Sequence, residues 1–550
     1  MIREQTAELV RKTIKDLQKE KIWPEFEMPE ILVERPEDFS HGDYSISMAF
    51  QLSKIIKKSP TEIASLLSEK LKVRNEKMFG KVAAAEPGFV NFFLSKEFLQ
   101  KQVAEILKQK EKFGQVNIGR GEKVNVEFIS ANPTGPLHVG NARGGFCGDV
   151  LANILAAAGH KTTREYYVND KGRQVYFLEH SLNPEETPVY KNIYINALQK
   201  RGIRDAERAT KFIIAEIKKT IAKMGISYDV WFFESDLYKN KEDKKALELL
   251  SKKGLTEEKE GGIWFKSKQE FADDKDRVLH KKTEERPEGN TYFLSEIAYL
   301  NNKFKRGFKR LIIFLGAEHH GYVPRIKAAT EALGYDKESV QPIIMQLVHL
   351  LEDGKEVKMS KRTGIYVTID ELLDEVGLDV ARFFFLMRGY GSHLNFDLDL
   401  AKQQSEKNPV YYVQYAHARI CSILAKSKNQ NSRLRASFAE VATKAEQGFG
   451  GQAKSKINLK SLTHPSELAL IKQLIRLPEI IEDISRDYQV QRLPQYAIDL
   501  ATSFHQFYRD CRVISEDKNL TRARLALVFA TKTVLKNTLA LMGVSAPEKM

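Results

Sequence analysis

The chain has 550 residues, 42% of them hydrophobic, and a formal net charge of +14 at pH 7. This length exceeds what one ordinary hydrophobic core organises, so roughly two to four domains are expected. Charged residues near the start and short apolar runs argue against a signal peptide and a membrane span. Three cysteines without a CxxC pair argue against structural zinc and predict reduced thiols in a cytoplasmic protein.

The positive charge is concentrated in the last part of the chain. Residues 401–550 contain 23 Lys and Arg against 13 Asp and Glu, whereas residues 1–120 contain 21 against 18. Such a surplus favours a polyanionic partner such as RNA. A solvated basic surface is the alternative, and charge alone does not decide between them.

The first segment, residues 1–112, reads as a small α+β unit. A helical repeat at its start is followed by two further helical patterns separated at Ser59-Pro60, with Thr61 as the expected N-cap of the second. Residues 86–95, EPGFVNFFLS, read as a turn that enters a strand.

The middle segment, residues 116–400, alternates strand and helix patterns, which predicts a parallel sheet. The strand candidates are residues 124–128, 162–168, 310–316 and 339–350. A charged stretch over 238–290 reads as an insertion between the two halves of the sheet.

From residue 402 onward the strand signal disappears, and helical spacing predicts a bundle over 402–550. Residues 426–462 are rich in Lys, Ser, Asn, Gln and Gly, so we expect a mobile loop there.

The most informative motif is HVGN, residues 138–141, which follows the strand candidate 124–128 and opens a helix. The N-terminus of a helix that follows a strand favours an anion, because its backbone N–H groups are unpaired and the helix dipole is positive there. His138 is a candidate phosphate donor, and Gly140 has no side chain that would block a nucleotide. A lone histidine is more often structural, so this motif alone is weak.

Two downstream motifs complete the pattern. KMSKR, residues 358–362, offers Lys358 and Lys361 as cations, although a run of this kind read alone is more often a solvated basic stretch. GAEHHGY, residues 316–322, follows a predicted strand, so Gly316, His319 and His320 are expected beside the same site as contacts for a ribose or adenine. Metal ligation by these histidines is the weaker alternative, since adjacent side chains usually point apart.

HVGN followed by KMSKR resembles the two signature motifs of class I aminoacyl-tRNA synthetases. The surrounding words are similar to arginyl-tRNA synthetases and occur in that family's order: SANPTGPLHVGNARGG, EYYVNDKGRQ, TYFLSEIAY, GAEHHGYVPRIKAA, SHLNFDLDLAKQQSEKNPVYYVQYAHAR and VLKNTLALMGVSAPEKM. The resemblance implies a multidomain α/β protein with a Rossmann-like catalytic domain (116–400), an N-terminal α+β domain that contacts the outer corner of tRNA (1–112) and a C-terminal α-helical bundle that reads the anticodon (402–550).

The resemblance also implies roles for particular residues. The catalytic set would be His138, Asn141, Lys358 and Lys361. The ATP-binding set would be Gly140, Gly316, His319, His320, Met359 and Ser360. The arginine pocket would be Glu127, Asn132, Tyr292, Glu296 and Gln346. The tRNA contacts in the bundle would be Tyr412, Ala416, Tyr508, Arg512 and Met550. Two carboxylates suit a guanidinium, which needs planar acceptors for a fork of hydrogen bonds. Tyr412 and Tyr508 read equally well as core aromatic residues.

Three residues and one motif differ from what is usual in the family. Asn141 stands where histidine is usual, Glu296 and Glu318 stand where aspartate is usual, and KMSKR is better preserved than in many arginyl enzymes. The two glutamates change the expected pocket geometry rather than the expected activity.

The implied reaction is the ligation of L-arginine to tRNA(Arg) with ATP, with Mg²⁺ accompanying the nucleotide, no resident metal, and no membrane or DNA partner. Three alternatives stay open at this point: a class I synthetase for another amino acid, an RNA-binding paralogue with an inactive site, and a small nucleotidyltransferase. The last alternative leaves the basic helical bundle unexplained.

Overall fold

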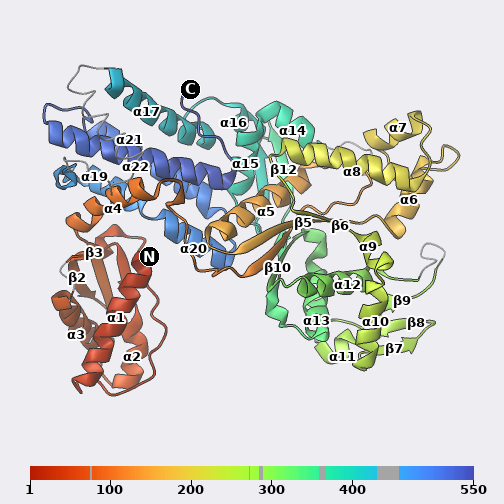
Figure 1. Ribbon diagram of the computed structural model, residues 1–550, viewed down its shortest axis with the longest axis horizontal. Helices are drawn as coiled ribbons and strands as arrows, with labels where there is room; N and C mark the ends of the chain where they lie inside the picture. The colour runs from red at the N-terminus through yellow and green to blue at the C-terminus, as the bar shows by residue number, and fades with distance from the viewer. Residues whose placement is uncertain (75–76, 272, 284–288, 358–366, 430–456) are drawn as a thin grey trace.

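The computed structural model describes residues 1–74, 77–271, 273–283, 289–357, 367–429 and 457–550, and Figure 1 shows their arrangement. A central parallel sheet lies between an N-terminal unit and a C-terminal helical bundle on one side and an inserted unit on the other. The predicted fold class, with an α+β unit, a parallel-sheet unit and a helical bundle, is confirmed.

The N-terminal unit is a three-stranded antiparallel sheet packed with helices. Its strands are ordered β1 (Tyr44–Ile46), β3 (Phe89–Leu94) and β2 (Phe79–Ala85). Its helices are α1 (Ile2–Lys19), α2 (Met48–Ile56), α3 (Pro60–Arg74) and α4 (Lys96–Gln109).

The cap of α3 is Ser59, not Thr61 as the sequence suggested. The Ser59 hydroxyl accepts from the Glu62 N–H at 3.2 Å, and the Glu62 carboxylate accepts from the Ser59 N–H at 2.9 Å. This reciprocal pair is a capping box, and it places Pro60 at the first helical position, where no backbone donor is needed.

The central sheet has five parallel strands in the order β11-β10-β4-β5-β6. They are β4 (Lys123–Glu127), β5 (Lys161–Val168), β6 (Val230–Phe233), β10 (Arg310–Gly316) and β11 (Val340–Met345). Parallel strands place all their carboxyl ends at one edge, where ligands bind in folds of this type.

The predicted strand 339–350 is wrong as a single element. It divides after β11, and β12 (Val348–Glu352) joins β13 (Lys355–Glu356) and β14 (Leu394–Asp397) in a separate sheet. The division occurs because the Gln346 N–H donates to the Tyr390 carbonyl at 2.9 Å, which turns the chain away from β10.

Helix α5 (Val139–Ala157) follows β4 and packs closely on the sheet. A Cβ added at Gly148 would lie 2.4 Å from Phe128 Cγ, so the small residue lets the helix approach. The other helices of this part are α6 (Arg173–Leu182), α7 (Ile193–Lys200), α8 (Ala206–Lys223), α9 (Glu234–Lys239), α12 (Tyr292–Lys305), α13 (Val323–Leu333), α14 (Ile369–Val376), α15 (Leu378–Leu386) and α16 (Leu398–Lys402).

The charged stretch 238–290 is folded between β6 and β10 in the chain. It contains α10 (Glu242–Lys252), α11 (Ser267–Phe271) and an antiparallel sheet of β7 (Thr256–Lys259), β8 (Gly262–Phe265) and β9 (Arg277–His280). Figure 1 shows this unit on the far side of the central sheet from the N-terminal unit.

The C-terminal bundle consists of α17 (Pro409–Asn429), α19 (Pro465–Leu474), α20 (Leu477–Asp487), α21 (Arg492–Asp510) and α22 (Lys518–Met542). The predicted loop 426–462 begins too early, because α17 continues to Asn429; its part 430–456 lies outside the described residues. Within the described ranges, α22 alone is long and apolar enough to cross a membrane by length and composition, a run that the sequence analysis overlooked. Of its most apolar window, 67% is buried, as in a core helix of a bundle.

A single guanidinium joins the sheet unit to the bundle. Arg382 on α15, 1% exposed, donates to Asp149 on α5 at 2.9 Å, to the carbonyls of Met224 and Gly225 after α8, both at 2.9 Å, and to the Met542 carbonyl at the end of α22 at 3.0 Å.

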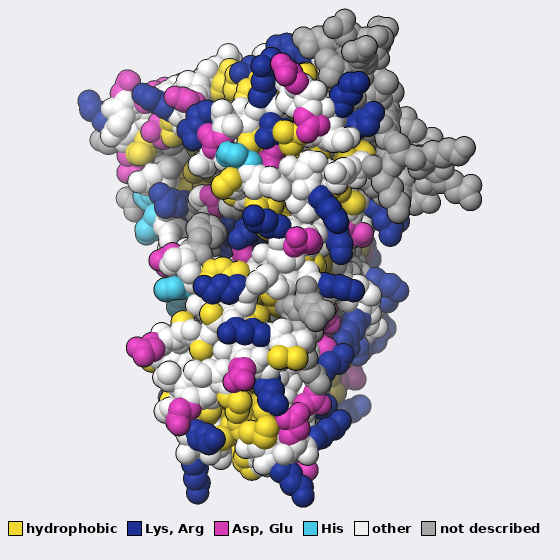
Figure 2. All heavy atoms as spheres, turned by 90° about the vertical axis from the view of Figure 1, so that its left-hand side faces the viewer, with side chains coloured by type: hydrophobic (Ala, Val, Ile, Leu, Met, Phe, Trp, Pro, Cys, Tyr) yellow, Lys and Arg dark blue, Asp and Glu magenta, His cyan; other side chains and the backbone are white. Residues whose placement is uncertain are grey.

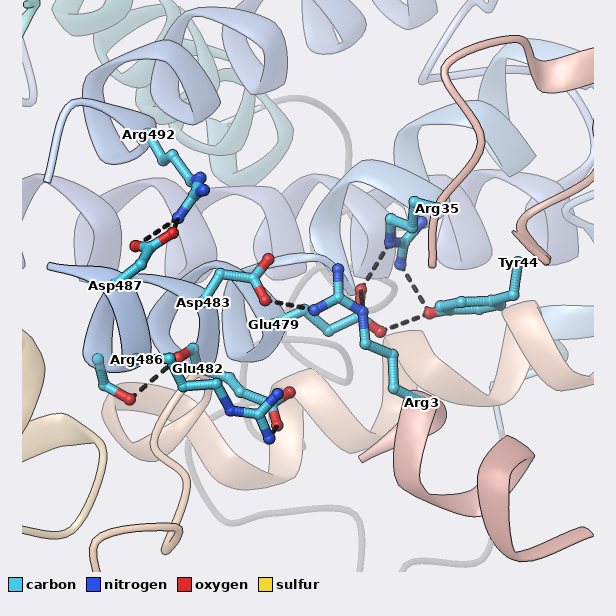
Figure 3. A network of polar contacts seen from close by, with 10 residues as sticks. Arg3, Arg35, Tyr44, Glu479, Glu482, Asp483, Arg486, Asp487 and Arg492 are labelled. Atoms are coloured by element: carbon cyan, nitrogen blue, oxygen red, sulfur yellow. Dashed lines mark hydrogen bonds and ion pairs between the residues drawn. The ribbon is translucent and has the colours of Figure 1, made fainter. Parts of the chain in front are cut away.

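Charged residues also join the N-terminal unit to the bundle, and this contact is called the clasp below (Figure 3). Glu479 on α20, 2% exposed, accepts from Arg35 Nε and from the Tyr44 hydroxyl, both at 2.6 Å. Beside it, Arg3 Nη1 donates to Asp483 at 2.5 Å. The two units therefore meet through a network of charged hydrogen bonds rather than a linker alone.

Candidate active site

The first part of the site is the start of α5. His138 is its N-cap, and its Nδ1 accepts from the Gly140 N–H at 3.1 Å. The side-chain Oδ1 of Asn141 accepts from the His138 N–H at 3.0 Å. Since Nδ1 accepts, the proton of the neutral imidazole lies on Nε2, so that nitrogen is a hydrogen-bond donor. A Cβ at Gly140 would lie 2.9 Å from His138 Cε1, so glycine permits this ring position.

The chain that follows KMSKR lies against the start of α5. The Val139 N–H donates to the Val367 carbonyl at 3.3 Å, the Ile369 N–H donates to the Leu137 carbonyl at 3.0 Å, and His138 forms an antiparallel bridge with Thr368. Lys358, Met359, Ser360 and Lys361 lie outside the described residues. The first described residues after them, 367–369, lie beside the HVGN motif, more than 200 residues earlier in the sequence.

The next candidate site residues lie at the ends of neighbouring strands of the central sheet. In the parallel register Glu127 pairs with Ile313 and Gly316 pairs with Met345, so Glu127, Gly316 and Gln346 all lie at the carboxyl edge of the sheet. The Gln346 carbonyl accepts from Arg143 Nη1 on α5 at 2.8 Å, which fixes its backbone.

The GAEHHGY residues form a short 3-10 turn at this edge. A Cβ on Gly316 would lie 2.5 Å from a Glu318 carboxylate oxygen, so the glycine leaves room for this position of the Glu318 side chain. His319 is 43% exposed, with Nε2 3.7 Å from Glu318 Oε1, and His320 is exposed. In the described part of the chain no group of three or more His, Cys, Asp or Glu is arranged to hold a metal ion.

An acidic pocket lies beside these strand ends. Glu127 is 8% exposed, and Glu296 on α12 faces it from one turn beyond Tyr292, whose ring is 50% exposed. Burial, and then the charge of Glu127, raise the pKa of Glu296 to about 7. The pocket therefore contains carboxylates that lack enough compensating charge.

A third carboxylate, Glu234, was missed by the sequence analysis. It begins α9 directly after β6, is 3% exposed and accepts from the Tyr238 hydroxyl at 3.0 Å. Burial raises its pKa to about 7. The available signal was its position in WFFES, where an acidic residue ends an apolar strand at the ligand-binding edge.

The backbone after β4 is strained where it enters the pocket. Ile129 and Ser130 have φ values of 64° and 40°, and a β-branched residue rarely adopts a positive φ. The turn is held because the Ser130 hydroxyl accepts from the Tyr167 N–H at 3.0 Å, and the Tyr166 hydroxyl donates to the Ala131 carbonyl at 2.9 Å. Asn132 follows this turn and is exposed.

The bundle residues singled out from the sequence differ in their exposure. Tyr508 is 36% and Met550 53% exposed, and Arg512 is exposed. Tyr412 is half-buried and donates to the Thr502 hydroxyl at 3.1 Å. Ala416 is completely buried, so its methyl group is not accessible to a base in this structure.

An additional aromatic residue, Tyr415, accompanies them. It is 39% exposed, and its ring stacks against His505 with centroids 6.0 Å apart. Arg419 lies over the Tyr508 ring at 5.2 Å. Exposed rings and guanidinium groups of this kind are the usual means of stacking unpaired RNA bases.

Comparison with known proteins agrees with this arrangement. The chain matches the family models described as arginyl tRNA synthetase N terminal domain over residues 4–94, tRNA synthetases class I (R), catalytic domain, over 102–198 and 179–384, and DALR anticodon binding domain over 413–550. The catalytic-domain model defines the class: a class I aminoacyl-tRNA synthetase fold.

Curated relatives and solved structures narrow the class further. The chain is 40% identical to the arginine–tRNA ligases of Bacillus subtilis and Bacillus licheniformis over 100% of its length, covering 100% and 99% of theirs. Its fold is similar to the arginyl-tRNA synthetases of Thermus thermophilus (TM-score 0.76, 23% identity, 100% of both chains) and Plasmodium falciparum (TM-score 0.73, 18% identity, 100% and 99%). The chain belongs to the arginyl-tRNA synthetase family.

Proposed function

We propose that this protein is an arginine–tRNA ligase that forms arginyl-adenylate from L-arginine and ATP and transfers the arginine to the terminal adenosine of tRNA(Arg). The observation that carries the substrate is the acidic pocket: three carboxylates, the buried Glu127 and Glu234 and the half-buried Glu296, lie at the edge of the sheet where α5 begins. A cationic amino acid supplies the charge that this pocket lacks.

The first step needs orientation and charge stabilisation more than acid–base chemistry. An oxygen of the arginine carboxylate, already ionised, attacks the α-phosphorus, and the bond to the bridging oxygen breaks as pyrophosphate leaves. His138 Nε2–H and the start of α5 are placed to stabilise the α-phosphate, with Gly140 allowing close approach and Asn141 holding the cap. Mg²⁺ enters with ATP as part of the substrate, bound by phosphate oxygens.

The remaining ATP contacts follow from the motifs. We assign the ribose and adenine to Gly316, His319 and His320, at the end of β10. Lys358 and Lys361 are assigned to the leaving β- and γ-phosphates, with Met359 and Ser360 shaping the KMSKR turn. Support for this assignment is the hydrogen bonding of Val367 and Ile369 to the chain around His138.

The arginine side chain is assigned to Glu296, Glu234 and the ring of Tyr292. Its α-ammonium and carboxylate are assigned to Glu127, Asn132 and Gln346, which lie nearer the start of α5. A guanidinium offers five donors in a planar fork, so two carboxylates on different elements fix it in one orientation.

The tRNA is assigned to the face formed by the N-terminal unit and the bundle. Figure 2 shows Lys and Arg side chains distributed over this face from the N-terminal unit up to the bundle. Tyr412, Tyr508, Arg512 and Met550 are the proposed anticodon contacts, with Tyr415 added and buried Ala416 as packing support. In the transfer step the 2′-hydroxyl of the terminal adenosine attacks the adenylate carbonyl and AMP leaves.

We propose the divisions 1–112, 116–400 and 402–550 for the elbow-binding, catalytic and anticodon-binding domains, and the cytoplasm as the compartment. The proposed function is tested by arginine-dependent exchange of pyrophosphate into ATP, measured with and without total tRNA. Exchange that requires both arginine and tRNA is the expected result.

Competition identifies the amino acid. Canavanine, which keeps a guanidinium-like group, should compete with arginine, whereas citrulline and lysine should not, since one lacks the charge and the other the planar fork. Exchange supported by another amino acid and not by arginine would refute the assignment. No exchange with any amino acid would favour a paralogue without activity.

A further inference from the structure

A fully buried lysine lies directly beneath the acidic pocket. Lys303 on α12 is 0% exposed, and its Nζ lies 2.5 Å from a carboxylate oxygen of Glu127 on β4. Its Nζ also lies over the Tyr299 ring, 4.1 Å from the centroid. A buried ammonium is costly unless it is paired, so this contact is a specific feature of the fold.

Next to Lys303, on β5, on α12 and directly after α12, three further polar side chains form a hydrogen-bonded network. The Tyr299 hydroxyl donates to Glu165 on β5 at 2.6 Å, and Arg306 makes two hydrogen bonds to the same carboxylate at 2.7 Å. Burial acts to raise the pKa of Glu165, but the hydrogen bonds of Arg306 and Tyr299 and the charge of Lys303 lower it overall. Glu165 is paired with Arg306, and the charge of Lys303 acts both on Glu165 and on the pocket side.

On the pocket side carboxylates outnumber closely paired cations. Glu127, Glu234 and Glu296 lie near one another; Lys303 is paired with Glu127, and the charge of Arg306 also reaches Glu127 from farther away. From α10, Glu242 faces Lys305 at 3.5 Å and not Lys303. Like charges at close range share protons unless a cation favours the ionised forms.

We propose that Lys303 is a positioning residue for amino-acid binding, which orients Glu127 toward the substrate and supplies positive charge inside the acidic pocket. This inference rests on the proposed function of the pocket. Lys303 does not touch the reacting atoms. It acts through Glu127, as an internal cation that stays when arginine leaves.

A purely structural lysine and this positioning lysine differ in their pH dependence. Because the charge of Lys303 lowers the pKa of Glu296, this carboxyl group takes up a proton more readily without Lys303. Bound arginine must displace that proton, so the loss of affinity should be largest at low pH. At high pH Glu296 is ionised, and removing a positive charge near a cationic substrate no longer weakens binding. A structural role alone would weaken binding equally at every pH.

The test compares equilibrium binding of L-arginine to the full-length wild type and to Lys303→Met at pH 6.5 and pH 8.5. We expect the Kd of the variant to exceed the wild-type value about tenfold or more at pH 6.5 and to agree within about twofold at pH 8.5. The KM for ATP should not change. Lys305→Met, the same substitution at a half-exposed site two residues away, is the matched control.

Two further variants keep the test decisive if Lys303→Met does not fold. Lys303→Arg retains the charge and should keep the wild-type pH profile of arginine binding, with a Kd changed less than about threefold. The double variant Lys303→Met/Glu127→Gln removes both buried charges and should fold, but should bind arginine weakly at both pH values.

The outcomes separate the two proposals. A Lys303→Met Kd that matches wild type at pH 6.5, or one raised equally at both pH values, would overturn the positioning role while leaving the ligase intact. A wild type that shows no arginine-dependent activity would instead overturn the proposed function.

Discussion

The acidic pocket and the clasp are both buried clusters of charge, but their charges are balanced differently. In the clasp each carboxylate has an arginine: Glu479 with Arg35 at 2.6 Å, Asp483 with Arg3 at 2.5 Å and Glu482 with Arg486 at 2.7 Å (Figure 3). In the pocket, within the described residues, Lys303 is paired with Glu127, whereas Glu234 and Glu296 form no ion pair.

This difference separates a structural contact from a binding site. A cluster in which each carboxylate is paired with a cation is not stabilised further by a cationic ligand. A cluster with an excess of carboxylates is stabilised when a cation binds. The pKa of about 7 for Glu234 and Glu296 follows from the same imbalance, because burial acts there without a paired cation. The predictions below test whether the two clusters behave as this comparison requires.

The largest effect is expected from Glu479→Ala in the clasp. The substitution leaves Arg35 and Tyr44 buried without their acceptor, which should destabilise the contact between the N-terminal unit and the bundle by about 3–5 kcal/mol. Chemical denaturation should show the loss, and arginine binding should stay within about twofold of wild type. A change below about 0.5 kcal/mol would mean that the clasp does not hold the units together.

The second effect is expected from Glu296→Ala in the pocket. Because the guanidinium loses a charge-assisted partner, the Kd for arginine should rise about 100-fold, equivalent to about 2.7 kcal/mol. The free energy of unfolding should not fall, since this carboxylate has no closely paired cation to orphan. Glu331→Ala on α13, where the side chain is 46% exposed, is the matched control, and a variant that still saturates at the wild-type arginine concentration would remove Glu296 from the pocket.

The third effect is a pH dependence of arginine binding. With its pKa raised to about 7, Glu296 is protonated in the empty pocket at pH 6, and binding a cation there must first release that proton. The Kd should therefore rise about fivefold from pH 7 to pH 6 for this carboxyl group and level off above pH 8. Glu296→Gln should flatten the profile, with the KM for ATP over the same range as the control.

The smallest effect is expected at the exposed edge of the clasp. Arg492 and Asp487 form an ion pair at 2.5 Å, but their side chains are 40% and 43% exposed. Solvent screens such a pair, so Arg492→Ala should change the free energy of unfolding by no more than about 0.5 kcal/mol. A loss as large as that of Glu479→Ala would show that burial is not what distinguishes the strong contacts of this interface.

Much of the fold was predictable from the sequence because its patterns are local. The alternation over 124–128 and the run 310–316 became β4 and β10, and the helical spacing after residue 402 became the bundle. The failures came from long-range contacts. The run 339–350 gives no local sign that Gln346 will bond to Tyr390 and leave the sheet.

Residues of the proposed site that belong to sequence motifs could be predicted, whereas residues that matter through the balance of buried charges could not. HVGN marks the start of α5, but Glu234 belongs to no motif that spacing identifies. Lys303 reads as an ordinary helical lysine, since such residues are rarely buried. The positive φ of Ile129 is likewise imposed by the surrounding contacts of the turn and has no signature in the chain.

Arg382 couples the position of the C-terminal bundle to that of α5. Its guanidinium bonds the last turn of α22 and the side chain of Asp149, which lies about 15 Å along α5 from the His138 cap. A shift of the end of α22 must either break these hydrogen bonds or move α5 with it. The end of α22 and the helix that begins at His138 are therefore coupled through the side chain of Arg382.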